Sequence, residues 1–203
     1  HAYDLYTHVA GVVAGVPADL PLRWAALLHD IGKVPTFTVD ETGRGHFYDH
    51  AAKGAEMAEA ILRRLKAPNA LREQVVLLIE KHMTKLEPEK KSIRRTRGRR
   101  GEQTVEALLL LQEADMGSKG TGLPAEMAQF AQIRQLIEEI KAENTCLRLK
   151  DLERNGHDLI ALGYSGPEIG NALNWLLEQV LDEQLPNEKN ALLRAIQDRR
   201  NLS

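Results

Sequence analysis

Residues 19–35, which read DLPLRWAALLHDIGKVP, decide the fold of this chain. Asp19 suits the first turn of a helix, and Gly32 suits the end of one. Between them, apolar side chains recur at intervals of three and four residues, as on one face of a helix. These side chains are Leu20, Trp24, Leu27, Leu28 and Ile31. The stretch therefore predicts an amphipathic helix that ends in a His29-Asp30 pair.

The same periodicity extends to both sides of this helix. Further amphipathic helices are predicted over residues 5–13, 48–66, 68–83, 103–116, 125–142 and 167–184, and after Pro186. Residues 36–45 are predicted to be a polar loop. Aromatic residues make up only 4% of the 203 residues, and turn signals are too sparse for a sandwich or barrel of short strands. We therefore expect an all-α fold.

The composition excludes several classes of protein. No apolar run exceeds about five residues, far short of the roughly 20 that cross a bilayer, and the N-terminus has no signal-like apolar block. A single cysteine, Cys146, cannot form an internal disulfide. These features predict a cytoplasmic protein without a membrane partner.

Several polar residues continue the apolar faces of the predicted helices, and so point inward. They are His8, His50, His82 and Asp115. An isolated inward histidine is usually a hydrogen-bonded core residue, but a buried carboxylate costs several kcal/mol unless a cation or donors compensate. Together with the His29-Asp30 pair, these residues can converge on one centre. Imidazoles and carboxylates in combination suit Mn, Fe, Co, Ni or Zn, and suit Mg less well.

Four segments resemble the HD superfamily of metal-dependent phosphohydrolases. The segments are Tyr6-Thr7-His8, Ala25-Ala26-Leu27-Leu28-His29-Asp30-Ile31-Gly32-Lys33, His46-Phe47-Tyr48-Asp49-His50 and Ala114-Asp115. The resemblance implies an HD-domain helical bundle that holds one or two divalent ions. It makes His8, His29, Asp30 and Asp115 the core ligands, and it makes His50 and His82 the additional ligands of a second ion.

The resemblance also implies chemistry at phosphorus, because bound divalent ions activate water and hold the charge that develops on phosphoryl oxygens. Asp30 is then expected to orient the water. Lys33, which follows the doublet directly, is expected to contact a substrate phosphate. The alternative for Lys33 is a solvated lysine near a helix C-terminus, where the macrodipole favours a cation.

The C-terminal part resembles the tail of bacterial CCA-adding tRNA nucleotidyltransferases of the poly(A) polymerase type. The resemblance rests on Asn155-Gly156-His157-Asp158-Leu159 and Gly166-Pro167-Glu168-Ile169-Gly170. It implies an HD domain over residues 1–117, a connecting helix over 118–144 and a tRNA-contacting helical tail over 145–203. The paired aspartates and glycine-rich turn of the family's nucleotidyltransferase head do not occur in the sequence. We therefore expect this chain to add no nucleotides itself.

The net charge of −2 conceals a segregation of charge. Residues Lys90–Arg100, KKSIRRTRGRR, hold seven basic residues and no acidic one, which leaves 20 basic against 29 acidic residues elsewhere. Such a run is either a solvated loop or a contact to a phosphate backbone. The second interpretation makes the RNA-contacting residues Lys33, Lys91, Arg94, Arg95, Arg97, Arg99 and Arg100.

Three functions remain open at this point. The first is the C-terminal portion of a CCA-adding enzyme that hydrolyses phosphoester bonds of nucleotides or RNA ends and contacts tRNA. The second is a non-catalytic tRNA-binding module with a structural metal. The third is a free-standing HD nucleotidase, against which the tail argues.

Overall fold

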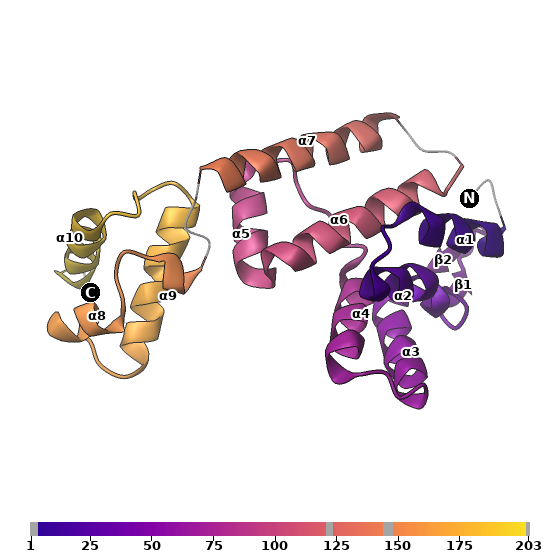
Figure 1. Cartoon of the computed structure of the whole chain (residues 1–203), viewed down its shortest axis with the longest axis horizontal. Coiled ribbons are helices and arrows are strands. Elements are labelled where there is room, and N and C mark those ends of the chain that lie inside the picture. The colour runs from indigo at the N-terminus through magenta and orange to yellow at the C-terminus, as the bar shows by residue number, and fades with distance from the viewer. Residues whose placement is uncertain (1–3, 121–123, 144–147, 202–203) are drawn as a thin grey trace. The chain divides into compact units, whose positions relative to one another are not determined.

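The computed structural model describes residues 4–120, 124–143 and 148–201, and helices dominate it (Figure 1). The all-α prediction is confirmed, apart from two strands of three residues each. Cys146 lies outside the described residues. The elements are α1 (Leu5–Gly15), α2 (Leu20–Leu28), the 3-10 helix η1 (Ile31–Lys33), β1 (Phe37–Val39), β2 (Gly45–Phe47), α3 (His50–Arg64), α4 (Asn69–Lys81), α5 (Lys90–Arg100), α6 (Glu102–Gly117), α7 (Pro124–Ala142), the 3-10 helix η2 (Leu149–Asp151), α8 (Gly156–Ala161), α9 (Pro167–Leu181) and α10 (Lys189–Asn201).

The chain divides into two compact units. Unit 1 comprises His1–Lys85 and Gln103–Ala131, and unit 2 comprises Leu86–Glu102 and Gln132–Ser203. All six predicted metal ligands therefore belong to unit 1, whereas the basic segment belongs to unit 2. The domain boundaries expected at residues 117 and 144 stay a prediction.

The core of unit 1 is built by the apolar faces of α1, α2, α3, α4 and α6. Its fully buried members include Val12, Leu62, Val75, Ile79 and Leu111. Each of them lies on an apolar face with helical periodicity, so burial of these faces against one another stabilises the bundle. The same faces fix the rotation of each helix about its axis. They therefore direct the polar residues that continue these faces towards the interior.

The backbone of η1 packs directly against the backbone of the first turn of α3. A Cβ atom at Gly32 would lie 2.0 Å from the carbonyl oxygen of His50 and 2.6 Å from the amide nitrogen of Gly54. Only glycine, which has no Cβ, allows so close an approach. The contact holds the start of α3, and with it His50, directly beside the segment that follows Asp30.

The predicted polar loop at residues 36–45 is partly wrong, because β1 and β2 form an antiparallel hairpin there. Phe37 pairs with Phe47, and Val39 pairs with Gly45. The Asp40 carboxylate closes the turn by accepting hydrogen bonds from the amides of Thr42 and Arg44, as aspartate commonly does in turns. The hydrogen bonds of the turn and those between the two strands therefore stabilise the hairpin, rather than a buried apolar face.

Unit 2 has a core of its own around α9, whose buried face includes Ala172, Leu176 and Val180. The predicted helix over 167–184 is confirmed, although α9 ends three residues earlier. The turn-rich stretch before it contains α8, which Asn155 caps by accepting from the amides of His157 and Asp158. No helix among the described residues has the length and apolar character needed to cross a membrane.

The basic segment is a helix, α5, and not a solvated loop. Arg94 is only 3% exposed, and it pairs with the carboxylates of Glu143 and Glu183. Arg97 is 1% exposed, and it contacts Glu102 at 3.2 Å. Carboxylates from distant parts of unit 2 thus compensate the repulsion among the cations of α5, which allows the helix to form and to bury part of its basic face.

Candidate metal centre

The structure brings all six predicted metal ligands to one region of unit 1. They come from five places: His8 in α1, His29 and Asp30 directly after α2, His50 at the first position of α3, His82 directly after α4, and Asp115 in α6. Two groups of three have ligand atoms within 4.8 Å of one another, and these groups are His8 with His29 and Asp30, and Asp30 with His50 and His82. Asp30 is common to both groups.

Distances within the centre show which atoms face one another. Asp30 Oδ2 lies 3.3 Å from His29 Nε2 and 3.7 Å from His8 Nε2, while Asp30 Oδ1 lies 3.8 Å from His50 Nε2. Asp115 Oδ1 lies 3.2 Å from His8 Nε2 and 3.6 Å from His29 Nε2. The two oxygens of Asp30 therefore face different histidines, so each oxygen could serve a different group of ligands.

Backbone carbonyls fix the histidine rings. Nδ1 of His29 donates to the carbonyl of Ala26 at 2.8 Å, and Nδ1 of His82 donates to the carbonyl of Ile79 at 2.6 Å. His50 makes the corresponding bond to the carbonyl of Phe47 at 2.9 Å. His8 Nδ1 lies 3.1 Å from the carbonyl of Ser118. Since a carbonyl only accepts, each of these Nδ1 atoms carries a proton, which leaves Nε2 as the atom that can bind a cation when the ring is neutral.

The residues fit a bound divalent cation. Nε2 of His29 and Nε2 of His50 are buried and have no hydrogen-bond partner among the described residues. A buried polar nitrogen without a partner is costly, and a cation held between either imidazole and Asp30 would give that nitrogen a partner. Imidazole nitrogens with carboxylate oxygens match Mn, Fe, Co, Ni or Zn. A structural zinc site rich in thiolates does not match this ligand set.

The electrostatics of the centre favour a cation there. Burial alone would raise the pKa of the Asp30 carboxyl and lower that of the His29 imidazole. Instead, His29 and Lys33 hold the pKa of Asp30 well below its usual range, and the carboxylates of Asp115 and Asp30 raise the pKa of His29 to about 9. A divalent ion must therefore displace a proton from His29 when it binds.

His82 differs from His29 in its charge state. Burial and the neighbouring imidazoles of His29 and His50 lower the pKa of His82 to about 4. Its ring is therefore neutral at pH 7 and ready to act as a ligand. Burial also acts on Asp115 to raise its pKa, but His29 and Lys119 outweigh this effect and lower it to about 2.

Two lysines lie beside the carboxylates. Lys33 Nζ contacts Asp30 Oδ2 at 2.6 Å, and its side chain is 17% exposed. Lys119 Nζ contacts Asp115 Oδ2 at 2.9 Å. Lys33 is predicted from the sequence to contact a phosphate, and this stays a prediction. Lys119 was not predicted, although its i+4 position relative to Asp115 is a readable signal. Both ammonium groups thus lie directly beside carboxylates of the candidate centre.

A pocket of about 520 Å³ in unit 1 lies against Asp30. Its walls are apolar side chains of α1, α2 and α3 and of the segment after η1, and Lys53 is its second charged residue. This pocket was not predictable from the sequence, because its members come from four separate segments. The pocket provides space for a substrate beside the candidate ligands.

The residues predicted to contact RNA fall into two groups. Lys33 lies at the metal centre in unit 1, and the other six belong to α5 in unit 2. Within α5, Arg94 and Arg97 are buried and paired, as described above. Lys91 and Arg95 are more exposed and contact Asp182 at 3.1 and 2.6 Å. Arg99 is 70% exposed, and Arg100 is partly buried.

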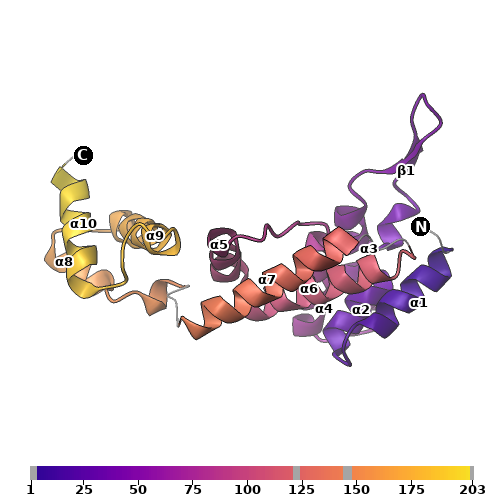
Figure 2. The ribbon, with the colours of Figure 1, turned by 90° about the horizontal axis from the view of Figure 1, so that it is seen from above.

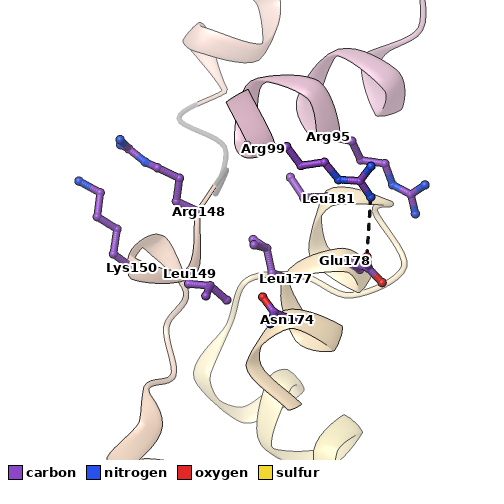
Figure 3. Close-up of a pocket in the computed structure, with 10 residues that line it drawn as sticks. Arg95, Arg99, Arg148, Leu149, Lys150, Asn174, Leu177, Glu178 and Leu181 are labelled. Carbon is purple, nitrogen blue, oxygen red and sulfur yellow. Dashed lines mark ion pairs between the residues drawn. The ribbon is translucent and has the colours of Figure 1, made fainter. Parts of the chain in front are cut away.

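A second pocket, of about 480 Å³, lies in unit 2 between α5, η2 and α9 (Figure 3). Four cations line it together with an apolar floor from Leu149, Leu177 and Leu181. The cations are Arg95, Arg99, Arg148 and Lys150. Figure 3 shows Arg99 pointing towards Glu178, and its guanidinium nitrogen lies 3.9 Å from a carboxylate oxygen of that residue. Arg148 and Lys150 were not predicted from the sequence, because they are separated from α5 by about 50 residues and carry no motif.

The family model of the HD domain matches residues 6–116 of the chain, more than half of its length. The matched range includes all six candidate ligands. It ends before most of unit 2.

Two relatives with curated names match most of the chain, and a third matches 39% of it. An A-adding tRNA nucleotidyltransferase of Deinococcus radiodurans is 35% identical over 164 residues, which are 79% of this chain and 38% of that protein. A CC-adding tRNA nucleotidyltransferase of Thermus thermophilus is 31% identical over 177 residues, 86% of this chain and 39% of that protein. A multifunctional CCA protein of Aromatoleum aromaticum is 43% identical over 82 residues. The chain thus spans less than 40% of the length of these relatives.

Proposed function

Because the chain belongs to the HD domain family, which implies the superfamily of metal-dependent hydrolases, we propose that unit 1 hydrolyses phosphoester bonds of nucleotides or RNA ends. The proposal assigns one or two divalent ions to the six residues of the centre. They are His8, His29, Asp30, His50, His82 and Asp115. A bound divalent ion supplies Lewis-acid chemistry to phosphoryl oxygens and activates water.

The observation that carries the proposal is the shared carboxylate. Asp30 belongs to both groups of potential ligands, and it is faced by buried Nε2 atoms of His29 and His50 that have no hydrogen-bond partner among the described residues. A site that served stability alone would cost less with apolar residues in these places. The arrangement of the ligands therefore supports a centre that is built for chemistry.

In the proposed reaction, residues of the chain orient the attacking water and neutralise the charge on the phosphoryl oxygens. Asp30 accepts a hydrogen bond from the attacking water and so directs it towards phosphorus. Lys33 contacts the phosphoryl oxygens as negative charge develops on them. Lys119 holds the Asp115 carboxylate in place through its contact at 2.9 Å, and the backbone carbonyls hold the imidazole rings.

Binding of a divalent ion is expected to stabilise unit 1. At a free concentration 100 times its dissociation constant, one ion adds about 2.7 kcal/mol to the free energy of unfolding, which corresponds to a rise of about 5–10 °C in the unfolding midpoint of a chain of this size. The measurement is thermal unfolding of metal-stripped protein with added Mn²⁺, Co²⁺, Ni²⁺ or Zn²⁺.

A pair of histidine variants serves as the control for this shift. His50→Ala removes a candidate ligand and should reduce the metal-induced rise, whereas His157→Ala alters an exposed histidine of unit 2 and should leave it unchanged. A midpoint that responds to none of the ions, or responds equally in both variants, contradicts the assignment of the ligands.

We further propose that unit 2 contacts tRNA and that the chain is the C-terminal portion of a tRNA nucleotidyltransferase. The names of the relatives support tRNA as the partner, and the cationic pocket of Figure 3 supports a contact to phosphates. Exposed Arg99 and Lys150 are the proposed phosphate contacts. Buried Arg94 and Arg97 have a structural part in this proposal, because their guanidinium groups pair inside the unit.

Neutralising the exposed cations is expected to weaken tRNA binding and to make the remaining affinity less dependent on salt concentration. Arg99→Gln and Lys150→Gln should each reduce the slope of log affinity against log salt concentration by about 1, without a change in the unfolding midpoint. Filter binding or fluorescence anisotropy over a salt series measures the slope.

Two further variants make this test specific. Lys85→Gln, at an exposed position in unit 1, should leave the slope unchanged. Arg94→Gln should lower the unfolding midpoint of unit 2, since it removes the pairing with Glu143 and Glu183. Equal slopes in the parent protein, Arg99→Gln and Lys150→Gln would refute the proposed contact.

A second candidate function is a tRNA-binding module whose metal only stabilises the bundle. The same ligand set supports it, because a structural ion would also satisfy the buried nitrogens. A hydrolysis assay distinguishes the two functions. The module is favoured if the metal-loaded chain binds tRNA but does not hydrolyse 2′,3′-cyclic nucleotides, nucleoside monophosphates or RNA ends.

A further inference from the structure

The β1–β2 hairpin leaves one apolar face uncovered. Phe37, Val39 and Phe47 share this face, because the register pairs Phe37 with Phe47 and Val39 with Gly45. The three side chains are 54%, 56% and 39% exposed. Figure 2 shows the hairpin standing out from the helices of its unit. Contiguous apolar side chains that the fold does not cover mark a binding surface.

Two aromatic rings form the centre of this face. The ring centroids of Phe37 and Phe47 lie 5.3 Å apart with an interplanar angle of 40°. The Phe37 ring also lies over Gly45, where a Cβ atom would approach its Cε2 atom to 2.6 Å. Glycine at position 45 thus leaves the room that the ring occupies. The outcome is a surface of aromatic rings on a two-stranded ribbon.

The turn holds the hairpin in shape without a core beneath it. Asp40 accepts from the amides of Thr42 and Arg44, and it lies 2.6 Å from Nε2 of His46. On the opposite face, the rings of His46 and Tyr48 stack with centroids 5.1 Å apart and an interplanar angle of 9°. An isolated hairpin is marginally stable, so these contacts order the apolar face before a ligand arrives.

Lys33 links this face to the metal centre. Its Nζ atom lies 5.7 Å from the centroid of the Phe47 ring and 2.6 Å from Asp30 Oδ2. One ammonium group therefore contacts both a candidate ligand and an aromatic ring of the hairpin. An anionic group that is bound at Lys33 has the apolar face of the hairpin beside it.

We infer that the hairpin face of Phe37, Val39 and Phe47 stacks a nucleobase of the substrate whose phosphate is held at Lys33 beside the metal centre. The inference rests on the proposed phosphoester hydrolysis and names the part of the substrate that gives it specificity. Unpaired bases bind proteins by stacking on exposed aromatic rings, and every base offers such a face. A phosphate with an attached base complements both the cation and the apolar rings.

The test compares ligands that differ only in their bases. A short oligoribonucleotide and an abasic oligoribonucleotide of the same length and charge are titrated into metal-loaded chain, and binding is followed by fluorescence anisotropy. Phe37→Leu keeps an apolar side chain but removes the ring, and should weaken binding of the base-bearing ligand about 5-fold or more. Binding of the abasic ligand should not change.

Two further variants complete the design. Thr38→Ala alters the opposite face of the hairpin and should leave both affinities unchanged. Phe37→Trp keeps a stacking ring, should retain the affinity, and should show quenching of its fluorescence by the base-bearing ligand alone. An unchanged metal-induced rise in the unfolding midpoint shows that each variant retains the centre.

Every outcome of this test decides between alternatives. Equal affinity of the parent chain for both ligands, or an equal loss for both in Phe37→Leu, overturns the inference. A change in the oligomeric state of Phe37→Leu, with unchanged affinities, identifies the face as a protein contact and also overturns it. Because the readout is binding, base-dependent affinity without hydrolysis would support the stacking surface and refute only the proposed catalysis.

Discussion

Replacement of Asp30 by asparagine is expected to abolish metal binding and phosphoester hydrolysis together. Its two carboxylate oxygens face different histidines, with Oδ2 3.3 Å from His29 and Oδ1 3.8 Å from His50. Asparagine keeps the shape of the side chain but removes the negative charge. It also replaces one carboxylate oxygen with an amide nitrogen, which cannot bind a cation. Both groups of ligands lose their common member. We expect a loss of at least about 100-fold in metal affinity and in kcat.

The matched control is Glu80→Gln, which neutralises a partly exposed carboxylate on α4, the helix that precedes His82. This variant should bind metal and hydrolyse substrate like the parent chain. Metal content after dialysis and initial rates on 2′,3′-cyclic nucleotides give the two measurements. Full activity in Asp30→Asn would remove Asp30 from the reaction and with it the shared-carboxylate centre.

Gly32→Ala is expected to have the largest effect on the structure of unit 1. The added Cβ would lie 2.0 Å from the carbonyl oxygen of His50 and 2.6 Å from the amide nitrogen of Gly54, both of which are backbone atoms. Since backbone atoms cannot move aside as side chains do, the first turn of α3 must shift. Overpacking commonly costs 1–3 kcal/mol, and we expect about 3 kcal/mol here, or roughly 6–12 °C in the unfolding midpoint.

The same shift displaces His50, so Gly32→Ala should also weaken metal binding. Gly117→Ala is the control in the same unit, because Gly117 ends α6, and no atom of another described segment lies within 4 Å of the position that a Cβ would take. It should leave the midpoint unchanged or raise it slightly. A Gly32→Ala variant that unfolds and binds metal like the parent chain would show that α3 does not depend on this contact.

The helices of unit 1 and the convergence of the candidate ligands were predictable for one physical reason. His8, His82 and Asp115 each continue an apolar face with helical periodicity, so the pattern that buries the core also turns these side chains inward. His8 and His82 are 1% and 4% exposed. The distances that relate the ligands were not predictable, because they depend on backbone contacts such as that of Gly32 with α3.

The hairpin was missed because its signal is short and its apolar face is not buried. Phe37-Thr38-Val39 does alternate apolar and polar side chains, but three residues are too few for a reliable strand pattern. The pairing also depends on Asp40, whose carboxylate closes the turn. A search for buried alternating faces cannot find a strand that stays exposed.

The basic helix α5 was beyond sequence reasoning for another reason. Seven cations in eleven residues indicate repulsion and solvation when they are considered alone. Glu143, Asp182 and Glu183, which offset this charge, lie about 40 or more residues further along the chain. Burial of Arg94 and Arg97 therefore follows from the tertiary structure, and no local pattern marks these two arginines apart from their neighbours.

The ring orientation of three histidines is set by a spacing of three residues. His29, His50 and His82 each donate Nδ1–H to the carbonyl of the residue three positions earlier. The main-chain carbonyls thus orient the imidazole rings, as outer carboxylates do in many metalloproteins. Any residue type can supply such a carbonyl. A designer who wishes to graft such a centre onto another scaffold can place histidine just past a helix end, as at His29 and His82, and leave the preceding positions free for packing.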